Sequence, residues 1–165
     1  MDIPRKTWKW RTQTWLVLMA GLTAILVALV ASYALAMFRP TTDVRIGQSG
    51  VYSLWTAETD SDLYKGLSNI QKLPKNGGLL MDFKVPGYHG IVMRDMFVPL
   101  DIVWLNEAKE VVTIVKNVSA DTPEATVYKP VVPARYVLEL PAGSTDASAI
   151  KKGDRADFEL GGADL

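Results

Sequence analysis

The sequence has 165 residues and a mass of 18.2 kDa, which is enough for one domain of ordinary size with an accessory segment. It contains 18 Lys and Arg residues and 18 Asp and Glu residues, so the formal net charge is zero and offers no electrostatic basis for binding nucleic acid. The chain has no Cys and one His, which excludes disulfides, a Cys nucleophile and a His-rich metal site. We therefore expect no metal, no other cofactor and no nucleic-acid partner.

An uninterrupted apolar segment covers residues 15–38 and contains no charged side chain. A helix over this range is about 36 Å long, which exceeds the hydrocarbon core of about 30 Å. We predict one transmembrane helix here, in contact with the lipid bilayer. The alternative is a signal peptide cleaved near Ala36, although the apolar region of a signal peptide is shorter, about 7–15 residues.

The basic residues that flank this segment closely lie mainly before it, in a tail over residues 1–14 that contains Arg5, Lys6, Lys9 and Arg11; only Arg39 and Arg45 lie close after it. Positive charge next to a membrane span favours the cytoplasmic side. The charge distribution therefore predicts a single-pass protein of the cytoplasmic membrane. Its N-terminus lies inside and its C-terminal domain lies outside.

Small residues recur at every fourth position of the span. This spacing lets two helix backbones approach closely. We therefore consider a homodimer formed through Ala20, Ala24, Ala28, Ser32 and Ala36.

The rest of the chain is typical of a mainly β domain. Residues 39–49 are predicted to form a linker, since Pro40 cannot continue a helix, and residues 161–165 a flexible tail. Between them, residues 50–160 alternate short β-forming segments with turn residues. Strands are expected over 51–57, 79–83, 91–93, 101–105, 110–116, 134–140 and 155–160, and short helices over 60–69 and 144–150. This pattern predicts one sandwich or barrel with one or two short helices.

Six segments carry a more specific pattern. They are residues 65–67 (KGL), 78–83 (GLLMDF), 93–105 (MRDMFVPLDIVWL), 111–114 (VVTI), 134–143 (ARYVLELPAG) and 150–154 (IKKGD). In order and spacing they resemble the DUF192 family, small β-rich domains of unknown function. The resemblance implies a β sandwich or barrel, agrees with export or membrane tethering, and brings no reaction and no cofactor.

The chain departs from the pattern of that family at three places. Ile91 and Val92 stand where the family usually has Phe-Trp, and residues 94–96 (RDM) where it has Lys-Asn-Thr. Ser68 stands where the family has Met. If those family residues line a site, this chain has altered it.

Three residues are weak candidates for catalysis. Asp95 and Asp101 flank an apolar segment and could act as an acid–base pair if the loop folds back. The competing interpretation is that Asp101 accepts backbone N–H groups or pairs with Arg94. His89, the single His, has no nucleophile motif around it.

Apolar and aromatic residues near the predicted loops suggest a binding site at the mouth of the β domain instead. These ligand-binding candidates are Tyr88, Met93, Arg94, Met96 and Phe97. The sequence therefore favours a membrane-tethered, non-catalytic binding or assembly module of the cell envelope, whose partner is an envelope protein or a small molecule. The alternative is an envelope hydrolase that uses the carboxylates of Asp95 and Asp101.

Overall fold

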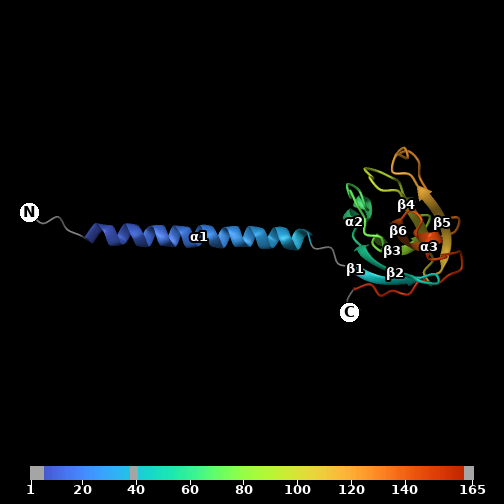
Figure 1. The fold of residues 1–165 in the computed structure, drawn as a ribbon, viewed down its shortest axis with the longest axis horizontal. Helices are drawn as coiled ribbons and strands as arrows, with labels where there is room; N and C mark the ends of the chain where they lie inside the picture. Colours follow the sequence, from blue (N-terminus) through green and yellow to red (C-terminus); the bar gives the residue numbers. More distant parts are fainter. Residues whose placement is uncertain (1–5, 38–40, 162–165) are drawn as a thin grey trace, which may run out of the picture. The chain divides into compact units, whose positions relative to one another are not determined.

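A computed structural model describes the backbone of residues 6–37 and 41–161, and the side chains of residues 15–33 and 41–161 (Figure 1). The chain divides into two compact units, Met1–Arg39 and Pro40–Leu165. Ala36 and residues 162–165 of the predicted tail fall outside the described side chains, so the predicted cleavage point and the tail stay predictions.

The first unit contains one long helix, α1 (Lys6–Met37), which begins within the segment predicted as a basic tail. Its stretch Trp15–Tyr33 has a mean hydropathy of 2.4 and is long and apolar enough to cross a membrane. The hydroxyls of Thr23 and Ser32 donate to carbonyls three residues earlier, at 2.9 Å each, so the helix itself satisfies them. A membrane anchor and a signal sequence both fit this helix.

The second unit is built on one six-stranded sheet that curls into a half-barrel (Figure 1). Its strands are β1 (Thr41–Ile46), β2 (Gly50–Ala57), β3 (Leu79–Gly87), β4 (Leu100–Leu105), β5 (Val111–Val118) and β6 (Ala134–Pro141). The spatial order is β1-β2-β3-β6-β4-β5, and every pair is antiparallel except the parallel pair β2–β3. Two short helices, α2 (Asp60–Lys65) and α3 (Ser144–Ala147), complete the domain. The predicted mainly β domain with one or two short helices is confirmed.

The structure differs from the sequence-based boundaries at the start of the domain. Residues 41–46, expected within the linker 39–49, form the edge strand β1, in which buried Val44 and Ile46 alternate with exposed side chains. Val44 lies opposite Tyr52 of β2 in the register. The domain therefore begins about ten residues earlier than the expected boundary at residue 50, by comparison of sequence positions.

Four other predicted elements are shorter than expected. The helix predicted over 144–150 ends at Ala147. The helix predicted over 60–69 ends at Lys65, because Gly66 adopts φ 51° and leaves the helical conformation. The strand predicted over 91–93 is reduced to one bridge between Ile91 and Tyr128. The last predicted strand, 155–160, makes isolated bridges at Arg155 and Asp157 rather than a continuous ladder.

These C-terminal bridges close the curled sheet. Arg45 of β1 exchanges two backbone hydrogen bonds with Asp157, at 2.9 and 2.8 Å. Two residues around the start of β5 bond to the same segment: Ala156 N–H donates to the Lys109 carbonyl at 2.9 Å, and Val111 N–H donates to the Asp154 carbonyl at 2.8 Å. Residues 154–158, the closing segment, thus cover both outer strands, whose backbone groups would otherwise be open to pairing with another chain.

The sheet has a hydrophobic cluster on each face. The first cluster takes buried side chains from all six strands and from the closing segment, including Leu54, Leu138 and Phe158. The second cluster, with Met81, Trp104 and Val137, is covered by α2 and by loops. The second face is therefore the one on which short, irregular segments cover the sheet.

A buried carboxylate ties three elements together. Asp101, at the start of β4, is 0% exposed. Its Oδ1 accepts the N–H of Asn117 in β5 at 2.8 Å, and its Oδ2 accepts the N–H and hydroxyl of Thr145 in α3, at 2.9 and 2.6 Å. Charge-assisted bonds of this kind are stronger than neutral ones. Asp101 thus joins β4 to β5 and to α3.

Replacing this carboxylate is expected to destabilise the domain. Asp101→Ala leaves three donors unpaired, of which the two on Thr145 are buried, and should lower the free energy of unfolding by about 1–3 kcal/mol. Asp101→Asn, which keeps one acceptor oxygen, should lower it by less. The measurement is chemical unfolding of the detergent-solubilised full chain, with Asp43→Ala, at an exposed position of β1, as the control. Equal stability of the wild-type and Asp101→Ala proteins would contradict this role.

Candidate functional site

The two aspartates predicted as a catalytic pair lie in different environments. Asp101 is fully buried, and its partners are Asn117 and Thr145 rather than Arg94. Asp95 is exposed in a turn with φ 52°, where its carbonyl accepts the N–H of Asn69 at 2.8 Å. The two carboxylates therefore do not share a water-accessible site.

His89 is held by its immediate surroundings. Its Nε2 donates to the Val85 carbonyl at 2.8 Å, and its ring stacks on Phe83 with centroids 4.0 Å apart. The His89 carbonyl in turn accepts the indole N–H of Trp104 at 2.9 Å. These contacts fix the turn after β3 and use the ring nitrogen that faces the backbone.

The five predicted ligand-binding residues divide by burial. Tyr88 and Phe97 are exposed to 59% and 54%, whereas Met93 is buried in the second cluster. Arg94 and Met96 line a pocket on the second face of the sheet. The structure thus brings two of the five into a cavity.

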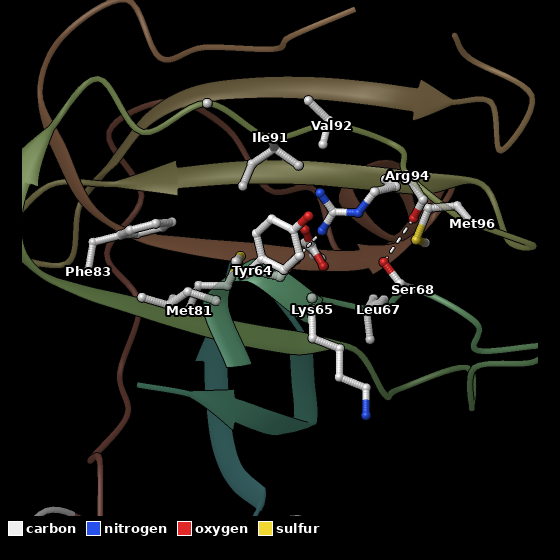
Figure 2. Close-up of a pocket in the computed structure, with 14 residues that line it drawn as sticks. Tyr64, Lys65, Leu67, Ser68, Met81, Phe83, Ile91, Val92, Arg94 and Met96 are labelled. Carbon is white, nitrogen blue, oxygen red and sulfur yellow. Dashed lines mark hydrogen bonds between the residues drawn. The ribbon is translucent and has the colours of Figure 1, made fainter. Parts of the chain in front are cut away.

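This pocket has a volume of about 250 Å³ and lies between α2, β3 and the loop over residues 90–96 (Figure 2). Its walls are mainly apolar, being formed by Leu63, Leu67, Met81, Phe83, Ile91 and Met96. Glu139 of β6 also lines it. A concave, mainly apolar cavity with few polar groups is typical of a small-molecule site.

The wall formed by α2 depends on local features of the sequence. Thr59 caps the helix by accepting the N–H of Asp62 at 3.2 Å, and the Gly66 N–H closes the last turn on the Asp62 carbonyl at 2.9 Å. Gly66 then turns away with φ 51°, a conformation that favours glycine. A Cβ at Gly66 would lie 3.8 Å from Oε2 of Glu139, so this turn passes directly over the carboxylate.

Arg94 connects the loop over residues 90–96, which forms a second wall of the pocket, to α2. Figure 2 shows its guanidinium against Tyr64, with the Arg94 Cζ atom 3.9 Å from the ring centroid. The guanidinium also donates to the Tyr64 carbonyl, and the Ser68 hydroxyl donates to the Arg94 carbonyl at 2.9 Å. Arg94 therefore holds the loop and α2 at a fixed separation around the pocket.

Glu139 is the distinctive polar group of the site. Its side chain is 5% exposed, and its neighbours across the sheet are Leu79 in β3 and Ile102 in β4. Among the residues that the structure describes, no group donates a hydrogen bond to its Oε2 atom. Burial raises the pKa of Glu139 to about 7, because a carboxylate is costly away from water.

The other buried carboxylates of the described residues do have hydrogen-bond donors. Three acidic side chains are buried in the described part of the chain, and Asp101 is bonded as above. Burial raises the pKa of Asp82, but hydrogen bonds from the Arg135 guanidinium at 3.0 and 3.1 Å, and from Lys84, outweigh it and bring that pKa below its ordinary value. Glu139 is thus the buried acid whose charge this part of the protein leaves uncompensated.

Glu139 is absent from the sequence-based candidates, although a pattern could have indicated it. It stands between Leu138 and Leu140 in a strand whose residues 136–140 are otherwise apolar or aromatic. An acidic residue in a strand covered on both faces has no solvated side to occupy. As for metals, the described residues contain no group of three His, Asp or Glu side chains placed to hold an ion.

The raised pKa of Glu139 makes stability depend on pH. Because the folded state holds this proton between about pH 4.5 and 7, the contribution is fully present below the unfolded pKa and is lost as pH rises through 7. Glu139→Gln removes the ionisation, so its stability relative to wild type should grow by roughly 3 kcal/mol from pH 4 to 8. Unfolding curves of the solubilised full chain at several pH values measure this, with surface Glu124→Gln as the control. Parallel pH profiles for wild type and Glu139→Gln would contradict the assignment.

Solved structures with a similar fold come from two bacteria. A candidate transcription regulator from Sinorhizobium meliloti 1021 has a TM-score of 0.68 and 23% identity, over 73% of this chain and 95% of that chain. A protein of unknown function from Novosphingobium aromaticivorans DSM 12444 has a TM-score of 0.64 and 25% identity, over 71% and 83%. The first likeness shows the fold alone.

A search of curated proteins finds no match. The model of the DUF192 family, described as "Uncharacterized ACR", matches residues 42–158, from β1 to the closing segment. This range contains the pocket and Glu139. The chain belongs to the DUF192 family.

Proposed function

We propose that this protein is a membrane-anchored, non-catalytic module that binds a small molecule in the pocket beneath α2. The observation that carries the proposal is the buried Oε2 of Glu139, which lines a cavity and has no donor among the described residues. A buried polar group without a partner costs free energy. A ligand that supplies the missing donor would recover that free energy on binding.

The hydrolase alternative has less support. It requires Asp95 and Asp101 to converge on one substrate. Asp101 is enclosed and already accepts three hydrogen bonds, while Asp95 is exposed on a turn. Glu139 has no second carboxylate beside it among the residues that line the pocket, so no acid–base pair replaces the first one.

The anchoring part of the proposal rests on α1. The stretch Trp15–Tyr33 passes the length and hydropathy requirements of a membrane span, and the hydroxyl groups of Thr23 and Ser32 are bonded within the helix. The basic residues of the N-terminal tail favour an inside N-terminus. The β domain would then bind its ligand on the outer side of the cytoplasmic membrane.

The absence of native Cys permits a direct test of this topology. We expect Lys75→Cys, at an exposed position of the β domain, to react with a membrane-impermeant maleimide in intact bacterial spheroplasts. Asp2→Cys should react only after lysis. Labelling of Asp2→Cys alone in intact cells would reverse the orientation, and a mature chain that begins near Met37 would identify α1 as a cleaved signal sequence.

Methionine methyl NMR on the full chain in nanodiscs tests binding at the pocket. Met81 and Met96 line the pocket, whereas Met19 lies in α1 and serves as an internal control. The probes are isopentylamine, isopentanol, isovaleramide and isovalerate, which share one apolar body and differ in the polar group. We expect at least one of them, at millimolar concentration, to shift the Met81 and Met96 resonances and leave Met19 unchanged. If none does, or if Met19 shifts equally, the proposed binding function fails.

A further inference from the structure

We propose that the ligand of this pocket is a small organic amine, bound as its ammonium ion with N–H groups on Glu139 and with its apolar body against the methionine and leucine side chains. This inference rests on the proposed function, because it names the chemical class that the same site would bind. Three features of the pocket point to this class: the hydrogen-bond donor that Glu139 lacks, the charges around Glu139 and the space available.

The first feature is the missing hydrogen-bond donor to Glu139. Oε2 of Glu139 is buried and accepts no hydrogen bond from the described residues. An ionised carboxylate can only accept hydrogen bonds, so the ligand must donate. A carboxylate or ether oxygen of a ligand would leave the ionised form of Glu139 without a partner.

The second feature is the uncompensated negative charge of an ionised Glu139. Burial of an ionised carboxylate is costly unless a cation pairs with it. No ion pair joins Glu139 to any basic side chain of the described residues. An ammonium ion supplies both the positive charge and the donors, whereas an alcohol or amide supplies only a donor.

The other charged and titratable groups that line the pocket form no ion pair with Glu139. From α2 they are Tyr64 and Lys65, from the loop over residues 90–96 Arg94, and from β6 Glu139 itself. Lys65 is exposed, and the Arg94 guanidinium is engaged by the ring and carbonyl of Tyr64. The pocket residues of β3, Met81 and Phe83, carry no charge. Glu139 is therefore the one acidic group among the described lining residues.

The third feature is the size and shape of the cavity. The cavity volume of about 250 Å³ is just below the range of about 300–1,000 Å³ usual for ligand pockets, so the occupant is small. Leu63, Met81 and Met96 offer apolar contact to its body. Met side chains adapt to irregular shapes, which suits a site that takes a branched or linear alkyl group.

Binding of an ammonium ion should favour the ionised form of Glu139 and therefore depend on pH. With a pKa of about 7 in the empty protein, the ionised fraction rises about 30-fold between pH 5.5 and 8. An alkylamine keeps its charge over this interval, as a Lys side chain does. The affinity of an amine should rise with pH by up to this factor, and that of a carboxylic acid should fall.

The experiment is a titration of the full chain in nanodiscs with isopentylamine, isopentanol and isovalerate at pH 5.5, 7 and 8, followed by the Met81 and Met96 methyl resonances. We expect isopentylamine to bind tightest at pH 8 and to weaken at least tenfold at pH 5.5. Glu139→Gln should lose at least tenfold in amine affinity at pH 8 and should lose the pH dependence. Surface Glu124→Gln is the matched control and should behave as wild type.

The outcomes separate the ligand class from the binding function. Tighter binding of isopentanol, or of isovalerate at low pH, would overturn the amine and leave the pocket as a binding site. Amine binding that is independent of pH, or unchanged in Glu139→Gln, would also overturn it. If no probe moves the pocket resonances, the binding function itself fails. A Glu139→Gln protein whose Met93 resonance matches wild type is folded, because Met93 is buried in the second cluster.

Discussion

The alternation of side chains along β6 is the constraint on which the site depends. β6 lies between β3 and β4, so both of its edges are paired, and clusters of side chains cover both faces. Successive residues of a strand point to opposite faces, which places Leu138 and Leu140 in the first cluster and Val137 in the second. Glu139 shares the face of Val137, where it is 5% exposed and lines the pocket. The sheet register thus creates the unpaired carboxylate, and α2 and the loop over residues 90–96 only shape the space above it.

Much of the fold could be predicted because its central strands carry local patterns. The segments 101–105 and 134–140 are rich in β-forming apolar residues and are strands in the structure. The edge strand β1 could not be found in this way, since TTDVRI is short and mostly polar and gains its backbone pairing only from β2 and Asp157. The strand predicted over 155–160 lies in the closing segment, but local alternation could not show that it pairs only through isolated bridges to Arg45 and Glu110, which are far away in the sequence.

The site was harder to predict because residue types do not reveal their environment. His89 and Asp101 carry reactive groups, yet both are committed to the backbone that surrounds them. Arg94 and Met96, which the sequence indicates by their place near predicted loops, line the pocket. Glu139 was missed, since its significance comes from the absence of a nearby donor, and that absence emerges only when β3, β4 and α2 are assembled around it. Asp82 is also buried, but the guanidinium of Arg135 lies beside it and donates two hydrogen bonds to its carboxylate. A neighbouring cation thus distinguishes Asp82 from Glu139.

The closing segment also has a consequence for the way in which the protein is made. β1 leaves the ribosome early and the start of β5 follows, yet both wait for residues 154–157 to complete their backbone pairing. Throughout most of translation the nascent domain has two open edges, which are the part of a β protein most exposed to association with other chains. Premature termination before residue 154 would make this condition permanent.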